Sequence, residues 1–145
     1  MTIWFISDTH FAHANMATVF TRADGSPSRV FTPARGAPPR GFTSCEEMDE
    51  LMIERWNKRV RPSDHIYHLG DFTMIRGAQS KWIATVLKRL NGHKRIVMGN
   101  HDQIPAKWYL ANGVEKIFGV RVIDNLVCTH IPIAPWSMAR FKANL

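Results

Sequence analysis

The sequence predicts an α/β fold, and two observations favour that class. Short apolar runs typical of buried strands occur at residues 2–7, 64–72 and 94–102. The stretches between these runs carry helical patterns, and such an alternation is typical of layered α/β proteins. The chain has 145 residues, which suits one domain spanning residues 1–145.

The first expected element is a short buried strand at residues 2–7, which leads into Asp8, Thr9 and His10. A segment rich in proline, glycine and arginine follows at residues 21–43. This composition excludes a helix and disfavours a central strand, so we expect an insertion loop. A loop of this length is either a surface insertion or a lid that faces a substrate, and both interpretations stay open.

The clearest helix is expected at residues 44–60, where Ser44 and Glu47 have the spacing of a capping box. Its apolar stripe indicates the inward face: Met48, Leu51, Met52 and Trp56. A second helix is expected at residues 79–90 and ends at an Asn-Gly pair. Its inward side chains are expected to be Trp82, Ile83, Val86 and Leu87.

The last third of the chain predicts shorter elements and a more antiparallel arrangement. A short helix is expected at residues 105–110. Two β-rich runs follow at residues 116–124 and 126–130, and the Asp-Asn pair at their junction indicates a hairpin turn. Prolines interrupt residues 131–145, so this segment carries no assignment.

The composition is typical of a globular protein, with 45% hydrophobic and 21% charged residues. The formal net charge of +7 favours either solubility alone or attraction to an anionic partner such as nucleic acid. No apolar run has the length of a membrane span, and no signal peptide is recognisable, so we expect a cytoplasmic protein without membrane contact. Cys45 and Cys128 are expected to be reduced thiols. The oligomeric state cannot be read from the sequence.

Polar side chains follow the apolar runs at the points where these runs end. They are Asp8 and His10 after the first run, Asp71 after the second, Asn100, His101 and Asp102 after the third, and His130 after the last. In α/β sheets, ligands collect outside the carboxyl ends of the strands. The sequence therefore predicts that these seven side chains meet in one crevice.

These side chains have the chemistry of a metal site. Asp8 and His10 are two residues apart on an extended segment and share a face, so both can reach one ion. The two oxygens of Asp71 can bridge to a second ion, to which Asn100 offers an oxygen and His130 a nitrogen. A mixed nitrogen and oxygen set suits Mn²⁺, Fe, Zn²⁺, Co²⁺ or Ni²⁺ better than magnesium. Without a thiolate, structural zinc is disfavoured.

Each motif alone is a weak signal, because Asp and His also cap turns and Gly-Asp pairs are common in turns. A lone histidine such as His130 is more often a hydrogen-bonded structural residue. The joint pattern carries the hypothesis, since all four motifs follow apolar runs in one order.

The motifs "DTH", "GDF", "GNHD" and "THIP", in this order, resemble the calcineurin-like metallophosphoesterases, most of all the small bacterial and phage members. The resemblance covers nearly the whole chain apart from residues 21–43. It implies a two-layer β-sandwich flanked by helices, in an αββα arrangement, with a two-metal site at the strand ends. It also implies hydrolysis of a phosphomonoester or phosphodiester by metal-activated water.

The resemblance further implies roles for single residues. Asp8 and His10 would bind the first metal, Asp71 would bridge, and Asn100 and His130 would bind the second. His101, paired with Asp102, would contact the substrate or protonate the leaving oxygen. The cofactors would be two divalent transition-metal ions, Mn²⁺ before Fe, Zn²⁺, Co²⁺ or Ni²⁺. Candidates for substrate contact, with a structural role as the alternative, are His13, Asn15 and Arg40.

The sequence departs from the family pattern at its end, because the final Gly-His-x-His motif is absent after "RFKANL". In the family, each of those two histidines completes the shell of one metal. Three explanations stay open. The chain lacks a C-terminal tail, which we favour slightly, or it is naturally truncated with weaker metal binding, or water, substrate or another subunit fills the gaps.

Two functions remain open at this point. The first is a metal-dependent phosphoesterase whose partner is a phosphate-ester substrate. The second is a catalytically weakened relative that binds phosphate, a nucleotide or nucleic acid, which the net charge and the four arginines of residues 21–43 favour. No nucleic-acid-binding signature supports the second function.

Overall fold

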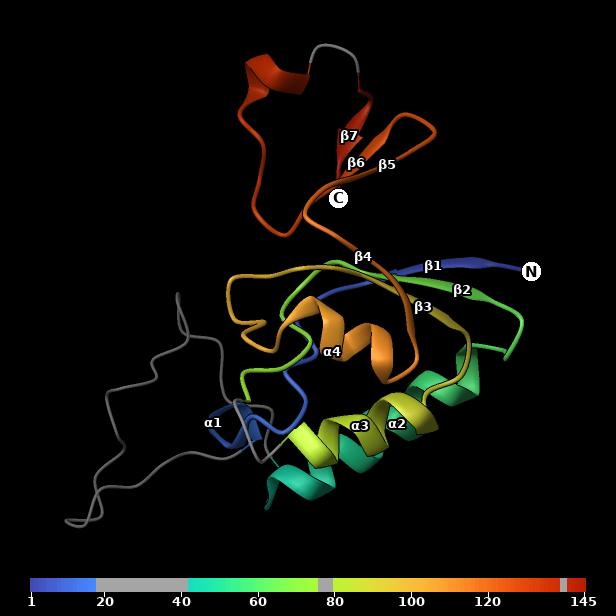
Figure 1. The fold of residues 1–145 in the computed structure, drawn as a ribbon, viewed down its shortest axis with the longest axis vertical. Coiled ribbons are helices and arrows are strands. Elements are labelled where there is room, and N and C mark those ends of the chain that lie inside the picture. The colour runs from blue at the N-terminus through green and yellow to red at the C-terminus, as the bar shows by residue number, and fades with distance from the viewer. Residues whose placement is uncertain (18–41, 76–79, 139–140) are drawn as a thin grey trace, which may run out of the picture.

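The computed structural model describes residues 1–17, 42–75, 80–138 and 141–145. Its main feature is a parallel four-stranded sheet in the order β1-β2-β3-β4 (Figure 1). The strands are β1 (Ile3–Ile6), β2 (His65–His68), β3 (His93–Val97) and β4 (Val114–Phe118). Helices flank this sheet, so the predicted α/β class is confirmed. Most of the expected insertion loop, from position 21 to position 41, lies outside the described residues.

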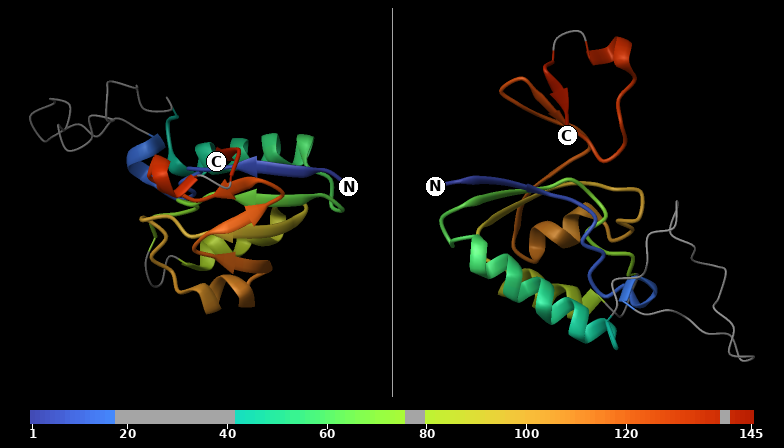
Figure 2. Two further views of the ribbon diagram at one scale, coloured as in Figure 1. Left: turned by 90° about the horizontal axis from the view of Figure 1, so that it is seen from above. Right: turned by 180° about the vertical axis from the view of Figure 1, so that it is seen from behind.

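Three helices cover one face of this sheet (Figure 1, Figure 2). They are α2 (Cys45–Arg59), α3 (Ser80–Arg89) and α4 (Ala106–Ala111), while the short α1 (Ala14–Ala17) lies beyond the end of β1. Parallel strands need crossover connections, and helices supply them here. The core between helices and sheet is apolar and includes Ile53, Trp56, Ile66, Ile83, Val86, Leu87 and Ile96.

The start of α2 follows the predicted pattern. Ser44 caps the helix, because its side chain accepts a hydrogen bond from the Glu47 N–H at 3.1 Å. The Glu47 carboxylate interacts in turn with the N–H of Ser44, as a capping box requires, and it also accepts from the N–H of Thr43 at 2.8 Å. The inward stripe differs, since Ile53 is buried whereas Leu51 is only half-buried.

The strand β1 is not buried as expected. It pairs with β2, and no strand of the described part of the chain lies on its other side. Ile3 is 45% exposed and Phe5 is 38% exposed, while Trp4 packs against the helix-side core. The carbonyls of Thr2 and Ile6 bond to the β2 segment. The N–H and C=O groups of Ile3 and Phe5 therefore point to the outer edge.

The predicted run at residues 116–124 divides between two sheets. Its first half belongs to β4, whereas β5 (Arg121–Ile123) pairs antiparallel with β6 (Leu126–Cys128) in a second sheet. The predicted hairpin between β5 and β6 is confirmed, and Asp124 in its turn has a φ of 52°. The strand β7 (Ala143–Asn144) joins β6 in parallel, so the last third is less antiparallel than expected. A 3-10 turn, η3 (Pro135–Met138), lies between β6 and β7.

The three-stranded sheet lies on the side of the first sheet away from α2 and α3 (Figure 1). A small buried cluster of Tyr67, Leu69, Val97 and Cys128 connects the two sheets. Among the helices that the structure describes, none is long and apolar enough to cross a bilayer.

Candidate metal centre

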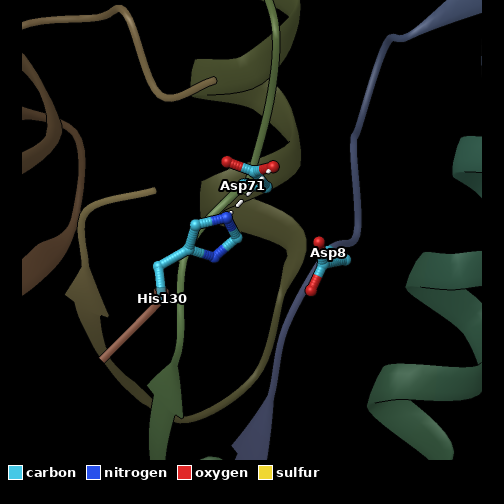
Figure 3. A group of neighbouring side chains, drawn as sticks. All are labelled: Asp8, Asp71 and His130. Atoms are coloured by element: carbon cyan, nitrogen blue, oxygen red, sulfur yellow. Dashed lines mark ion pairs between the residues drawn. The ribbon is translucent and has the colours of Figure 1, made fainter. Parts of the chain in front are cut away.

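Three of the side chains predicted to meet lie close together, near the ends of β1, β2 and β6. Asp8 follows β1, Asp71 follows β2 and His130 follows β6. One ligand atom from each of these three lies within 4.8 Å of the others. Figure 3 shows His130 facing Asp71, with Asp8 beside them on the loop after β1. The parallel order of β1 and β2 accounts for the neighbouring positions of Asp8 and Asp71, since the carboxyl ends of these strands share one edge, whereas His130 comes from β6 of the second sheet.

The loops after β1 and β2 run side by side and hold each other in an unusual conformation. The N–H of Asp8 donates to the Gly70 carbonyl, and the N–H of His10 donates to the Asp71 carbonyl, both at 3.0 Å. Asp8, His10 and Asp71 all have left-handed φ angles, between 51° and 55°. Such a conformation costs about 1–3 kcal/mol per residue and persists only where the surroundings fix it. Backbone strain is therefore concentrated at the candidate ligands.

Two glycines allow the ligands to approach the backbone closely. A Cβ atom on Gly99 would lie 2.2 Å from Oδ1 of Asp71, and one on Gly70 would lie 2.5 Å from Nδ1 of His130. Gly70 also has a φ of 99°, which side chains rarely adopt. The glycines of "GD" and "GNHD" thus leave room for the neighbouring candidate ligands.

Two more histidines lie around Asp71. His10 is only 10% exposed, and its Nε2 is 3.7 Å from Oδ2 of Asp71 and 3.8 Å from Oδ1 of Asp8. His101 is 38% exposed, with its Nε2 3.9 Å from the same Asp71 oxygen. The backbone N–H of His101 donates to Oδ1 of Asp71 at 2.9 Å. Asp71 is therefore the common neighbour, with one oxygen bound to backbone and the other facing three imidazoles.

The ring of His130 has a defined proton position. Its Nδ1 lies 2.9 Å from the Leu69 carbonyl, which can only accept, so Nδ1 carries the proton. In the neutral ring, Nε2 then presents its lone pair. This atom faces Oδ1 of Asn100 at 2.9 Å and Oδ2 of Asp71 at 3.3 Å. Three acceptor atoms pointing at one another fit a cation between them, and the carbonyl fixes the ring as metal sites require.

Comparison with known proteins agrees with this geometry. A family model described as calcineurin-like phosphoesterase matches residues 1–140. This chain belongs to the calcineurin-like phosphoesterase family.

Two proteins that are similar to this chain are described without an assigned activity. The uncharacterized protein MJ1445 of Methanocaldococcus jannaschii is 33% identical over 106 residues, which are 73% of this chain and 49% of that protein. The crystal structure of the protein of unknown function AQ665 from Aquifex aeolicus has a TM-score of 0.57 and 26% identity. It matches over 90% of this chain and 60% of its own. The chain thus spans about half the length of the curated relative it matches.

Asp102, which was expected to pair with His101, has other hydrogen-bond partners among the described residues. Its Oδ1 accepts from the N–H groups of Phe72 at 2.8 Å and Thr73 at 3.2 Å, and its Oδ2 accepts from that of Gly99 at 2.9 Å. The hydroxyl of Tyr109 adds a fourth, longer bond at 3.3 Å. Burial and the adjacent carboxylate raise the pKa of Tyr109. Within the described contacts, Asp102 therefore ties the loop after β2 to the loop after β3.

The remaining predicted contacts are placed only in part. His13 lies beside the site, with its ring 5.5 Å from that of His10. Arg40 and the side chain of Asn15 lie outside the described part of the chain. His68 is fully buried, which lowers its pKa to about 3, so its ring is neutral near pH 7. Its Nε2 lies 3.0 Å from the Thr9 hydroxyl, which places it beneath the site loop.

One buried residue at this site was not anticipated. Asp49 of α2 is 1% exposed and accepts hydrogen bonds from the backbone of the loop that carries His10. A sequence signal existed, because Asp49, Ile53 and Trp56 have the i, i+4, i+7 spacing of one helix face. An acid on the apolar face of a helix is expected to have a buried partner.

Proposed function

We propose that this protein is a metal-dependent phosphoesterase that hydrolyses a phosphomonoester or phosphodiester. The observation that supports this most is the cluster of ligand atoms from Asp8, Asp71, Asn100 and His130, which come from separate loops and lie close together. Membership of the phosphoesterase family gives the cluster a chemical context.

The donor set fits two divalent cations that share Asp71. Asp8 and His10 would hold the first, and Asn100 and His130 the second. Mixed nitrogen and oxygen donors suit Mn²⁺ first, with Fe, Zn²⁺, Co²⁺ or Ni²⁺ as alternatives. A metal pair of this kind neutralises phosphate charge and lowers the pKa of water toward ~7, so that hydroxide is available at neutral pH.

His101 is suited to act on the substrate itself. Its side chain is partly exposed, so it can reach a bound ester, while its backbone N–H is fixed on Asp71. An imidazolium at this position would donate a proton from Nε2 to the leaving oxygen. General-acid help of this kind contributes about 10²–10⁴-fold in rate.

The test is hydrolysis of an aryl phosphodiester and an aryl phosphomonoester by the protein supplied with Mn²⁺. We expect His101→Ala to lose about 10²–10⁴-fold in kcat and to keep its metal in elemental analysis. His93→Ala is a matched control, because His93 is an exposed histidine of β3 that pairs with Glu115 rather than with the site. A wild-type protein that retains no transition metal after supplementation would refute the proposal.

The proposal also includes the full αββα arrangement, in which two sheets pack face to face between helices. The cluster of Tyr67, Leu69, Val97 and Cys128 supports it, since these side chains are buried between the two sheets. The formal net charge of +7 supports an anionic substrate. Comparing hydrolysis of the aryl phosphodiester with that of the aryl phosphomonoester distinguishes the two substrate types.

A further inference from the structure

A buried acid outside the ligand set contacts the loop that carries the first ligands. Asp49 lies on α2, and each of its carboxylate oxygens is 3.0 Å from the backbone nitrogen of Ala12. Ala12 stands between His10 and His13 in the loop after β1. A carboxylate of the helix layer therefore binds the backbone of the site loop directly.

Every second residue of this loop has a backbone conformation that hydrogen bonds from neighbouring segments must hold in place. Asp8, His10 and Ala12 have φ angles of 55°, 51° and 61°, all in the left-handed region. Non-glycine residues stay in this region only where the surrounding structure holds them. Carbonyls of the loop after β2 hold the N–H groups of Asp8 and His10. Asp49 does the same for Ala12.

Asp49 also links the loop to a third element. The indole N–H of Trp82 on α3 donates to Oδ2 of Asp49 at 2.6 Å. One carboxylate thus joins α2, α3 and the site loop. An amide cannot replace it without loss, because hydrogen bonds to a charged acceptor are roughly twice as strong as neutral ones. The amide would also turn its own N–H donors toward Ala12 or Trp82.

We propose that Asp49 is a positioning residue of the metal site, which sets the directions of His10 and His13 through the backbone of Ala12. This inference rests on the proposed function, because the site that Asp49 serves is the proposed phosphoesterase site. Asp49 acts through Ala12 rather than by contact with metal or substrate.

The first experiment measures Co²⁺ binding by calorimetry and by the visible spectrum of the bound ion. Asp49→Asn should bind Co²⁺ about 10–100-fold more weakly, as is typical when a residue that orients metal ligands is changed. Its visible spectrum should also change. Trp82→Phe removes the donor on α3 but keeps both contacts to Ala12, so its Co²⁺ affinity should stay close to that of the wild type. Glu54→Gln, at an exposed position of the same helix, is the control for a lost charge.

The second experiment needs no metal and separates this inference from the proposed function. Amide hydrogen exchange at Ala12 should be faster in Asp49→Asn, and the ring signals of His10 and His13 should shift, whereas Trp82→Phe should leave both unchanged. An Asp49→Asn protein that is merely less stable, with wild-type Ala12 exchange and wild-type Co²⁺ affinity, would overturn the inference. If the wild type itself binds no Co²⁺, the proposed function fails, and Ala12 exchange still decides the role of Asp49.

Discussion

Gly99 has a role beyond forming a turn. The carboxylate of Asp71 rests directly on its backbone, at the place where a Cβ atom would be. A glycine at a turn is usually explained by the φ angles that it can adopt. At Gly99 the absence of a side chain matters instead, because the carboxylate of Asp71 needs the space. The space for the Asp71 carboxylate therefore depends on Gly99, which belongs to the "GNHD" motif.

Gly99→Ala should displace Asp71 and abolish Mn²⁺ binding, because the new Cβ would lie 2.2 Å from Oδ1. Overpacking of this kind costs about 1–3 kcal/mol of stability, so the protein should still fold. Titration calorimetry with Mn²⁺ and urea unfolding measure the two effects. Gly119→Ala is the control, since its Cβ would meet nothing within 4 Å. Unchanged Mn²⁺ affinity in Gly99→Ala would contradict the close approach.

Asp102→Asn should lower both stability and metal affinity, whereas His101→Ala should lower turnover alone. The Asp102 carboxylate accepts from three backbone N–H groups, and hydrogen bonds to a charged group contribute about 1.5–3 kcal/mol. Urea unfolding of both variants tests this difference. If Asp102→Asn is as stable as the wild type and shares the kinetic defect of His101→Ala, the two residues act as a pair after all.

At the level of residues, the sequence predicted which side chains gather at the site better than it predicted their hydrogen-bond partners. Asp8, Asp71 and His130 were placed together because the carboxyl ends of strands share an edge. The partners of Asp102 could not be predicted, since they depend on which N–H groups the loops after β2 and β3 present to it. Asp49 was missed because the surrounding acids resemble a solvated helix face.

At the level of elements, helices were predicted more accurately than the burial of strands. The cap at Ser44 is local, and so its signal lies in adjacent residues. The burial of β1 depends instead on its position in the sheet order, which an apolar run does not encode. The division of residues 116–124 between two sheets was missed for a similar reason, since only Gly119 marks the boundary.

Asp64, which directly precedes β2, predicts that the stability of the fold depends on pH in a specific way. Hydrogen bonds from the N–H groups of Arg61 and Thr2, together with the indole N–H of Trp4, lower the pKa of Asp64 from 3.8 to about 2. The unfolded chain therefore takes up this proton at higher pH than the folded protein. The stabilisation by Asp64 is complete above the unfolded value and is lost as pH falls through about 4 toward about 2.

Asp64→Asn should accordingly lower the urea midpoint by a constant amount above about pH 5, and by less as the pH falls toward 3. Urea unfolding across this range measures the difference from the wild type. Glu54→Gln, which changes an exposed acid, should show no such convergence. A difference between Asp64→Asn and wild type that does not depend on pH would contradict the depressed pKa.

At the level of the whole molecule, the candidate site exists only when distant parts of the chain are folded together. Its side chains follow β1, β2, β3 and β6, so both sheets contribute. A metal ion that needs all of these loops binds the folded state and not the unfolded one. Metal binding should therefore stabilise the whole fold.

Mn²⁺ at about 100 times its Kd should add about 2.7 kcal/mol of stability. For a chain of this size, that corresponds to a Tm increase of roughly 5–10 °C. Asp71→Asn should abolish the increase, because Asp71 lies next to the candidate ligands Asp8, His10 and His130. Thermal unfolding followed by circular dichroism, with and without Mn²⁺, provides the measurement. An equal increase in the variant would place the ion elsewhere.

The outer edge of β1 has a practical consequence for work with this protein. Ile3 and Phe5 present apolar surface and open backbone groups along that edge, and neither proline nor lysine interrupts it. Edges of this kind template the addition of strands from other molecules and so promote aggregation. We expect the protein to aggregate at high concentration. Ile3→Lys or Phe5→Lys would be the first substitution to try for crystallisation.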